Sequence, residues 1–114
     1  MLFVKKTQLW ILSLNTNFNI QHIKMVKIGR YNYEKSTRKD KKLMTKVKGK
    51  TIHFGNPKYQ HYKDRTGIWK DKDHNDKKRR DNYLTRSKGI LDGDGNPTYK
   101  NPESPNFHAR NVLW

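Results

Sequence analysis

The chain has 114 residues, of which 26 are Lys or Arg and 10 are Asp or Glu, so its formal charge is +16. Its hydrophobic content of 32% excludes a large buried core, and the absence of Cys excludes disulfides and thiolate zinc sites. A charge of this size indicates a polyanionic partner, which can be DNA, RNA, an acidic protein surface or an anionic lipid. The Tyr, Phe and Trp residues supply the burial that one small folded domain needs.

Residues 1–24 differ from the rest of the chain because they contain three Lys and no acidic residue. Their apolar run, LWILSL, is too short to cross a bilayer, so no membrane span is expected. We interpret this segment as an N-terminal extension or interaction arm before a natural start at Met25. A targeting peptide and a core strand are the alternatives. Residues 25–114 are then expected to form a single small basic domain.

The pattern after this segment predicts a short antiparallel β unit. Residues 26–34 alternate between apolar and polar side chains and predict one strand. Residues 35–42, KSTRKDKK, predict a charged turn or a disordered loop. Residues 43–54 alternate again, and Gly49 within them predicts a tight turn or a bulge.

Residues 76–88 predict a short helix that is rich in basic side chains. Asn75 or Asp76 is suited to cap its first turn, because either side chain accepts a hydrogen bond from a free N–H group. Gly89 is suited to end it in the left-handed conformation. The basic side chains of this helix are Lys77, Lys78, Arg79, Arg80, Arg86 and Lys88.

The remaining segments are shorter or less regular. Residues 58–76 predict a loop or a short helix, and the Asp-Gly repeats in 91–99 predict a tight hairpin or loop. Ser104 as a cap and Pro105 at the first helical position predict a short C-terminal helix. The expected fold is therefore a small α+β domain, in which a short antiparallel sheet is accompanied by one basic helix and a short C-terminal helix.

We expect the basic helix and the basic loop to bind a polyanion. The candidates in the loop are Arg38, Lys39, Lys41 and Lys42, and they add to the six basic residues of the helix. No helix-turn-helix motif or RNA-recognition signature is present, so such contacts would position a partner without reading its sequence. A solvated charged surface is the alternative. Stacking of Tyr31 and Tyr33 on nucleic-acid bases is a further possibility, but we expect these rings to pack the core.

Three aromatic side chains, Trp69, Phe107 and Trp114, are candidate anchors for a protein partner, because aromatic residues contribute most to the energy of interfaces.

No metal site, cofactor or reaction is expected. The acidic residues and histidine in DKDHND, residues 71–76, resemble a ligand set, but acids before a helix are favoured by capping and by the helix dipole. Residues 92–96 resemble part of a calcium loop, but their neighbouring prolines favour a simple turn. No nucleophile motif or phosphate-binding loop occurs, so we expect a non-enzymatic protein without a small-molecule substrate.

The segments KGKTIHFGNPKYQHYKD, HNDKKRRDNYLTRSKGI and NPESPNFHARNVLW resemble a family of small basic proteins of unknown function in nucleocytoplasmic large DNA viruses. The resemblance covers residues 48–114, and it carries no catalytic residues. The matching motifs are the strand Lys50–Gly55, the loop Lys63-Asp64, the Arg-rich helix Lys77–Arg86, and the closing run from Ser104-Pro105 to Leu113-Trp114.

The resemblance implies a viral origin and a place in the virion, with assembly in the host cytoplasm or nucleus. We therefore expect a structural or minor component of a large DNA virus particle that attaches capsid or core proteins through its basic surface. The alternative is a sequence-nonspecific nucleic-acid-binding protein that coats or condenses the genome with DNA or RNA as its partner. A basic ribosomal-type protein is a third possibility.

Overall fold

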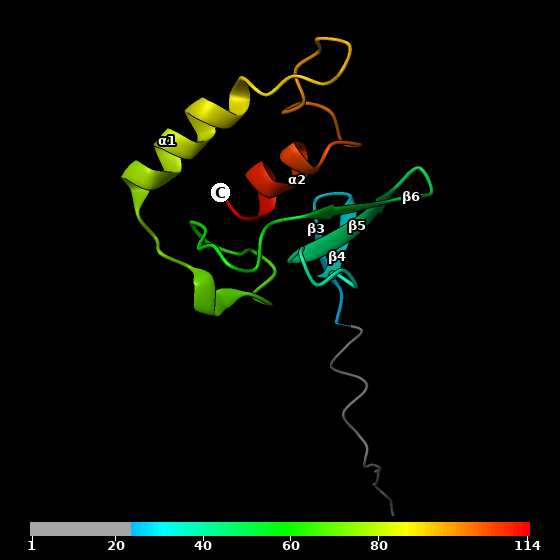
Figure 1. Ribbon diagram of the computed structural model, residues 1–114. Helices are drawn as coiled ribbons and strands as arrows, with labels where there is room; N and C mark the ends of the chain where they lie inside the picture. The colour runs from blue at the N-terminus through cyan, green and yellow to red at the C-terminus, as the bar shows by residue number, and fades with distance from the viewer. Residues whose placement is uncertain (1–23) are drawn as a thin grey trace, which may run out of the picture.

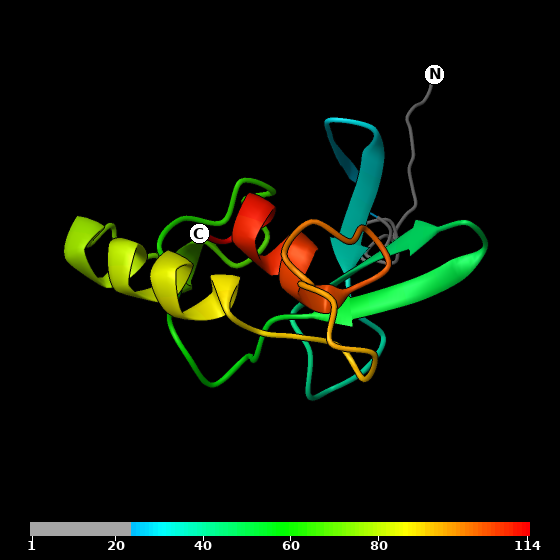
Figure 2. The same ribbon diagram turned by 90° about the horizontal axis from the view of Figure 1, so that it is seen from above.

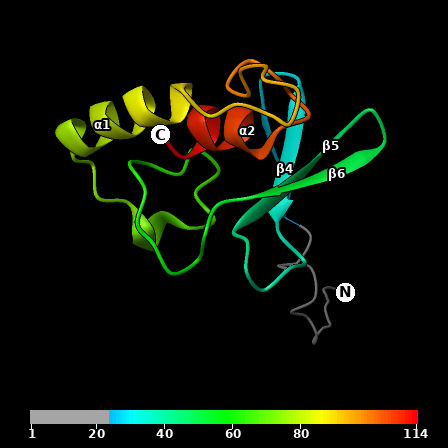
Figure 3. The same ribbon diagram turned by 45° about the horizontal axis from the view of Figure 1, so that its top comes forward.

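The computed structural model describes residues 24–114 and shows a four-stranded antiparallel sheet with two α-helices (Figure 1). This arrangement confirms the expected α+β class. Apart from Lys24, the predicted N-terminal extension lies outside the described residues. Two further views show that α2 (Pro105–Val112) lies between the sheet and α1 (Lys77–Lys88) (Figures 2 and 3).

The sheet is a meander in which each strand pairs antiparallel with the next strand of the sequence. One row of paired residues crosses it from Val26 through Tyr33 and Thr45 to Ile52. Side chains alternate along a strand, so this row lies on one face, the face that carries the core. The strands in sheet order are β3 (Val26–Ile28), β4 (Tyr31–Lys35), β5 (Leu43–Val47) and β6 (Lys50–Phe54).

The prediction of one strand over residues 26–34 is wrong, because the chain reverses after Ile28 and forms both β3 and β4. Ile28 pairs with Tyr31, so two residues make the turn, and Gly29 at its first position has a φ of +63°. The apolar positions change from even to odd numbers at this glycine. That change of phase was the sequence signal for the turn.

The turn predicted at Gly49 is confirmed. Val47 pairs with Lys50, and the two residues between them, Lys48 and Gly49, have φ angles of +52° and +80°. Positive φ at both central residues is the requirement of the tight turn that best matches the twist of a hairpin.

The core lies between the sheet and α2. His108 of α2 is fully buried: its Nε2–H donates to the backbone oxygen of Pro102 (2.6 Å), so its Nδ1 accepts from the Tyr33 hydroxyl (2.8 Å). Tyr31 packs its ring edge-on against the same imidazole, which confirms that both tyrosines serve the core. The buried cluster contains Tyr33, Leu43, Phe54, Ala109, Val112 and Leu113.

Both helices begin where the sequence predicted. The Asp76 carboxylate accepts hydrogen bonds from the N–H groups of Lys78 and Arg79, and the Ser104 hydroxyl accepts from Asn106 ahead of α2. The predicted left-handed end of α1 is wrong, because Gly89 has a φ of −86°. The N–H of Gly89 donates to the backbone oxygen of Arg86, and such tighter bonds satisfy the last turn without a left-handed residue.

The segment between β6 and α1, residues 55–75, contains only one short 3-10 helix, η2 (Lys70–Lys72). Its backbone pairs with the end of α2 instead: Lys63 N–H donates to the Leu113 oxygen (3.1 Å), and Arg65 N–H donates to the Val112 oxygen (3.0 Å). The Asp64 carboxylate is buried and accepts bonds from Thr66 and Trp69, which fixes a turn inside the segment. Polar bonds therefore organise this region.

The substitution Gly55→Ala is expected to lower the free energy of unfolding by about 2–4 kcal/mol. Gly55 has a φ of +81°, and an added Cβ would lie 3.0 Å from both the Leu113 side chain and the Lys42 side chain. Gly67→Ala is the matched control, since its φ is +76° with no atom within 4 Å of the new Cβ, and it should cost about 1 kcal/mol. Urea unfolding followed by Trp fluorescence measures both, and equal losses would contradict the predicted steric contact.

Candidate polyanion-binding surfaces

Because α1 is the layer farthest from the sheet, most of its side chains face solvent. Five of its six basic residues are exposed, and Arg80 is half-buried. The exposed residues are Lys77, Lys78, Arg79, Arg86 and Lys88. We call these five residues with Arg80 the α1 basic surface.

The arginines of the α1 basic surface are held in place by neighbouring groups. Arg80 Nε donates to the backbone oxygen of Trp114 (2.9 Å), and its guanidinium lies over the Tyr62 ring. Arg79 donates to the Gln60 side-chain oxygen (3.1 Å). Guanidinium groups that are positioned in advance lose less entropy when they bind an anion.

The basic loop between β4 and β5 forms a second surface. It borders a hollow of about 270 Å³, in which Lys35 Nζ lies 5.5 Å from the centre of the Trp69 ring. Arg38 is neutralised by an exposed ion pair with Asp40 (2.8 Å). The basic residues that line the hollow are Lys35, Arg38, Lys39 and Lys41. We call it the Trp69 hollow.

The α1 basic surface and the Trp69 hollow are not continuous. The β4–β5 loop lies at one end of the sheet, and the segment 55–75 runs between this loop and α1 (Figures 1 and 3). A single compact ligand therefore cannot contact both, whereas an extended polymer or a protein surface can.

Lys42 does not belong to either surface, and its prediction as a polyanion-binding residue is corrected by its burial. Its side chain is 2% exposed, and its Nζ donates to the backbone oxygen of Tyr59 (2.7 Å) and lies 2.7 Å from His61 Nδ1. Strand alternation from Leu43 would place residue 42 on the outer face with Met44. The chain leaves the strand at this point, because Lys42 N–H bonds to both Phe54 and Gly55 oxygens.

His61 links Lys42 to a carboxylate, which the sequence did not indicate. His61 Nε2 lies 2.6 Å from Asp73 Oδ1, so Lys42, His61 and Asp73 form one buried chain of hydrogen bonds. Burial lowers the pKa of Lys42 from 10.5 to about 8, against the opposing charge of Asp64. These residues are 12 to 31 positions apart in sequence and share no motif, so local patterns gave no signal for the chain.

Five of the ten acidic side chains bind groups within the fold. The Asp64 carboxylate accepts a hydrogen bond from the Thr66 N–H, and the Asp73 carboxylate accepts one from the Asp64 N–H, both within the segment 55–75. Asp76 caps α1. Asp92 accepts from two N–H groups of its own tight loop, and Glu103 pairs with Lys48 and Lys50. These acids thus bind donors within the fold, while most basic residues of both surfaces remain exposed beside fewer exposed acids, among them Asp40 and Asp81.

The predicted aromatic anchors have intramolecular contacts. Trp69 is half-buried and donates from Nε1 to the Lys42 backbone oxygen (2.8 Å). Trp114 stacks on Tyr83 with ring centres 4.1 Å apart, and Phe107 packs edge-on against Tyr31. These contacts show that the three rings stabilise the fold. Their role with a partner stays a prediction.

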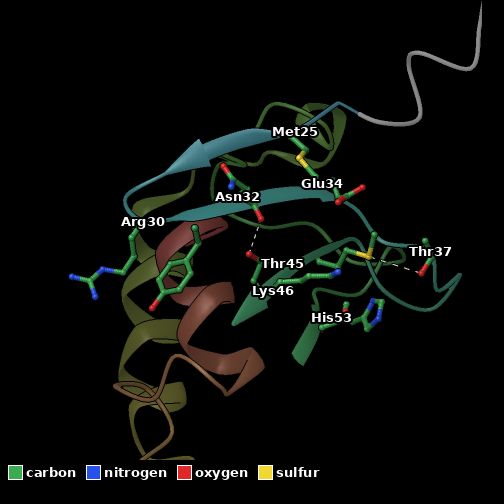
Figure 4. A pocket seen from close by; sticks show the side chains of 11 residues that line it. Met25, Arg30, Asn32, Glu34, Thr37, Thr45, Lys46 and His53 are labelled. Atoms are coloured by element: carbon green, nitrogen blue, oxygen red, sulfur yellow. Dashed lines mark hydrogen bonds between the residues drawn. The ribbon is translucent and has the colours of Figure 1, made fainter. Parts of the chain in front are cut away.

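The outer face of the sheet has a different character. Figure 4 shows a hollow of about 460 Å³ on this face, into which side chains of β4, β5 and β6 project. Glu34 and Lys46 bring both signs of charge to it, and His53 is held by the Ser36 hydroxyl at 2.7 Å. This mixed lining does not suit a polyanion as well as the two basic surfaces do.

In residues 24–114, no group of three or more His, Asp or Glu side chains is placed to hold a metal ion. Within DKDHND the capping explanation holds for Asp76, whereas Asp73 binds His61 and the Asp64 N–H. The same described region contains no helix with the length and apolar character needed to cross a bilayer.

Comparison of the chain with protein-family models, with curated proteins and with solved structures gives no match.

The free energy of unfolding is expected to fall as the pH is lowered from 6.5 to 5.5. Burial lowers the pKa of His61 and His108 below 6.5, so the unfolded chain takes up protons in this range that the folded chain excludes. Each histidine contributes at most about 1.4 kcal/mol per pH unit. Urea unfolding at pH 7.5, 6.5 and 5.5 measures the slope. His108→Gln should make it shallower, and constant stability over the range would contradict the prediction.

Proposed function

We propose that this protein is a non-enzymatic structural component of a large DNA virus particle that attaches capsid or core components through its basic surfaces. The observation that carries the proposal is the separation of charge within the fold. Half of the acidic groups bind donors within the fold, and most lysines and arginines of α1 and of the Trp69 hollow face solvent. Such a surface attracts a polyanion and repels a second copy of itself.

The viral assignment rests on the resemblance over residues 48–114. Two of the motifs on which the resemblance depends form helical elements of the fold. Lys77–Arg86 lies within α1, and Ser104 and Pro105 form the start of α2. A location in the virion, reached from the host cytoplasm or nucleus, follows from this resemblance.

The second candidate is a sequence-nonspecific nucleic-acid-binding protein, and the Trp69 hollow favours it. Basic side chains around an aromatic ring are the groups that bind single-stranded nucleic acid, in which phosphates pair with cations and bases stack on rings. The separation of the two basic surfaces also suits a long polymer.

Binding to duplex DNA at several salt concentrations should distinguish the two candidates. A genome-coating protein loses affinity with a slope of about −0.9 in log–log form for each phosphate that it neutralises. Lys77→Gln with Lys78→Gln should reduce that slope by about 2, because each substitution removes about one phosphate contact. Fluorescence anisotropy of a labelled duplex measures the slope.

The matched control for this experiment is Lys27→Gln with Lys46→Gln. These two lysines are equally exposed but lie on β3 and β5, so the net charge changes by the same amount. Equal effects of the two pairs would show that α1 is not the contact surface. Absence of salt-dependent DNA binding would reject the genome-coating candidate and leave acidic proteins as partners, and absence of the chain from purified particles would reject the virion component.

A further inference from the structure

A pocket beneath the N-terminal half of α1 contains two groups that the proposed function does not use. It has a volume of about 190 Å³ and lies between the segment that follows β6, α1 and α2. Aromatic and aliphatic side chains form its walls, and Lys42 and His61 line it together. The residues that line the pocket include Lys42, His61, Tyr59, Tyr83, Leu113 and Trp114.

Lys42, His61 and Asp73 have the relative placement of a nucleophile, a base and a group that orients the base. Lys42 Nζ lies 2.7 Å from His61 Nδ1, and His61 Nε2 lies 2.6 Å from Asp73 Oδ1. The Asp64 N–H also donates to Asp73 Oδ1 at 2.8 Å, which fixes the carboxylate. Contacts of this length in this order activate a nucleophile for covalent chemistry.

The surroundings favour the neutral amine. Burial lowers the pKa of Lys42 to about 8, and at pH 7.5 roughly a quarter of such amines are unprotonated. An exposed lysine at the same pH has about one amine in a thousand unprotonated. The other charges that act on Lys42 all come from the segment 55–75: Asp64, Asp71 and Asp73 favour the ammonium, and Lys72 opposes it.

The chain of hydrogen bonds also gives the ammonium proton a place to go. The proton can move transiently from Nζ to His61 Nδ1: burial and the charge of Lys42 lower the pKa of His61, but the charge of Lys42 is lost in the transfer, and the Asp73 carboxylate favours the imidazolium. The imidazolium is then stabilised by its 2.6 Å bond to Asp73. The amine keeps its bond to the Tyr59 oxygen, which holds the nitrogen at the pocket.

Two arginines of α1 bond to residues that line the pocket: Arg79 to the Gln60 side chain (3.1 Å) and Arg80 to the Trp114 backbone oxygen (2.9 Å). Positive charge therefore lies next to the lining of the pocket. An anionic substituent on the ligand would remain near these arginines while its uncharged end reaches Lys42.

We propose that Lys42 is a nucleophilic amine that forms a Schiff base with an aldehyde carrying an anionic group. The Nζ lone pair attacks the carbonyl carbon, and the carbonyl electron pair moves to oxygen, which takes a proton from the His61 imidazolium. Water then leaves with the carbonyl oxygen, the proton from His61 and one amine hydrogen. The second amine hydrogen returns to His61, and a carbon–nitrogen double bond forms without any oxidant or reductant. Two sources supply this chemistry: a free carboxylate- or phosphate-bearing aldehyde, and the ring-opened sugar of an abasic site in nucleic acid.

Reductive trapping with cyanoborohydride at pH 7.5 tests the proposal on the unsubstituted chain. One arm uses glyoxylate, the other uses a duplex oligonucleotide with one abasic site, and peptide mass spectrometry locates the modified lysine. Lys42 should react at least about tenfold faster than Lys77 or Lys78, because more of its amine is unprotonated. Reaction only in the first arm identifies a small aldehyde as the source, and reaction at Lys42 in the second identifies nucleic acid.

The glyoxylate arm does not depend on polyanion binding, so its result is separate from that of the proposed function. Lys42→Arg should abolish the adduct while retaining the charge, whereas Lys46→Arg, at an exposed position on β5, should leave it unchanged. If Lys42 reacts no faster than the exposed lysines in both arms of the unsubstituted chain, the proposal is overturned. That comparison does not require any variant to fold.

Asp73→Asn separates a role in the chemistry from a role in folding, because an asparagine oxygen can still accept both hydrogen bonds of Asp73 Oδ1. Without the carboxylate charge, the imidazolium is no longer stabilised, and the trapping rate at pH 7.5, where the pair still holds the proton, should fall at least about tenfold. The midpoint of the pH profile should move to lower pH, since a charge that favours the ammonium is removed. An unchanged rate at pH 7.5 would contradict the assignment of His61 as the proton carrier.

Discussion

The buried amine of Lys42 joins the sheet to the segment 55–75, and the placement of both helices depends on that junction. Its Nζ bonds to the Tyr59 oxygen and to His61, whose ring bonds to Asp73 near the start of α1. The same segment supplies the N–H groups of Lys63 and Arg65 that pair with the end of α2. A buried cation is tolerated only when it is paired and hydrogen-bonded, so this region has few alternative arrangements. Because only 32% of its residues are hydrophobic, the chain uses hydrogen bonds between polar groups to hold segments together that a larger hydrophobic core would hold in other proteins.

The charge distribution of the surface follows from this construction. Carboxylates orient His61, fix the turn at Asp64 and cap α1, so these three groups are already engaged within the fold. A few basic residues, such as Lys42 and Arg110, also bind groups within the fold, but most of those on α1 and around Trp69 stay exposed. The same bonds that stabilise a weakly hydrophobic chain thus leave an excess of positive charge facing solvent, where it can bind a polyanion.

The two proposed sites meet at the N-terminal half of α1. Arg79 and Arg80 belong to the α1 basic surface, and they also hold the rim of the Lys42 pocket through Gln60 and Trp114. Lys42 reaches this place because β5 begins only at Leu43 and the N–H of Lys42, just before it, bonds with the Phe54 and Gly55 oxygens.

Local sequence patterns determined the elements whose formation depends on near neighbours. Asp76 and Ser104 as caps, the turn at Gly49, the alternation in 43–54 and the exposed basic residues of α1 were all predictable, because each rests on contacts within a few positions. The phase change at Gly29 was equally local and was missed. The chain from Lys42 through His61 to Asp73, the pairing of residues 63 and 65 with the end of α2, and the burial of Lys42 itself were decided only by the tertiary structure. Those contacts join residues far apart in sequence, and neither periodicity nor composition specifies which distant groups will share a desolvated site.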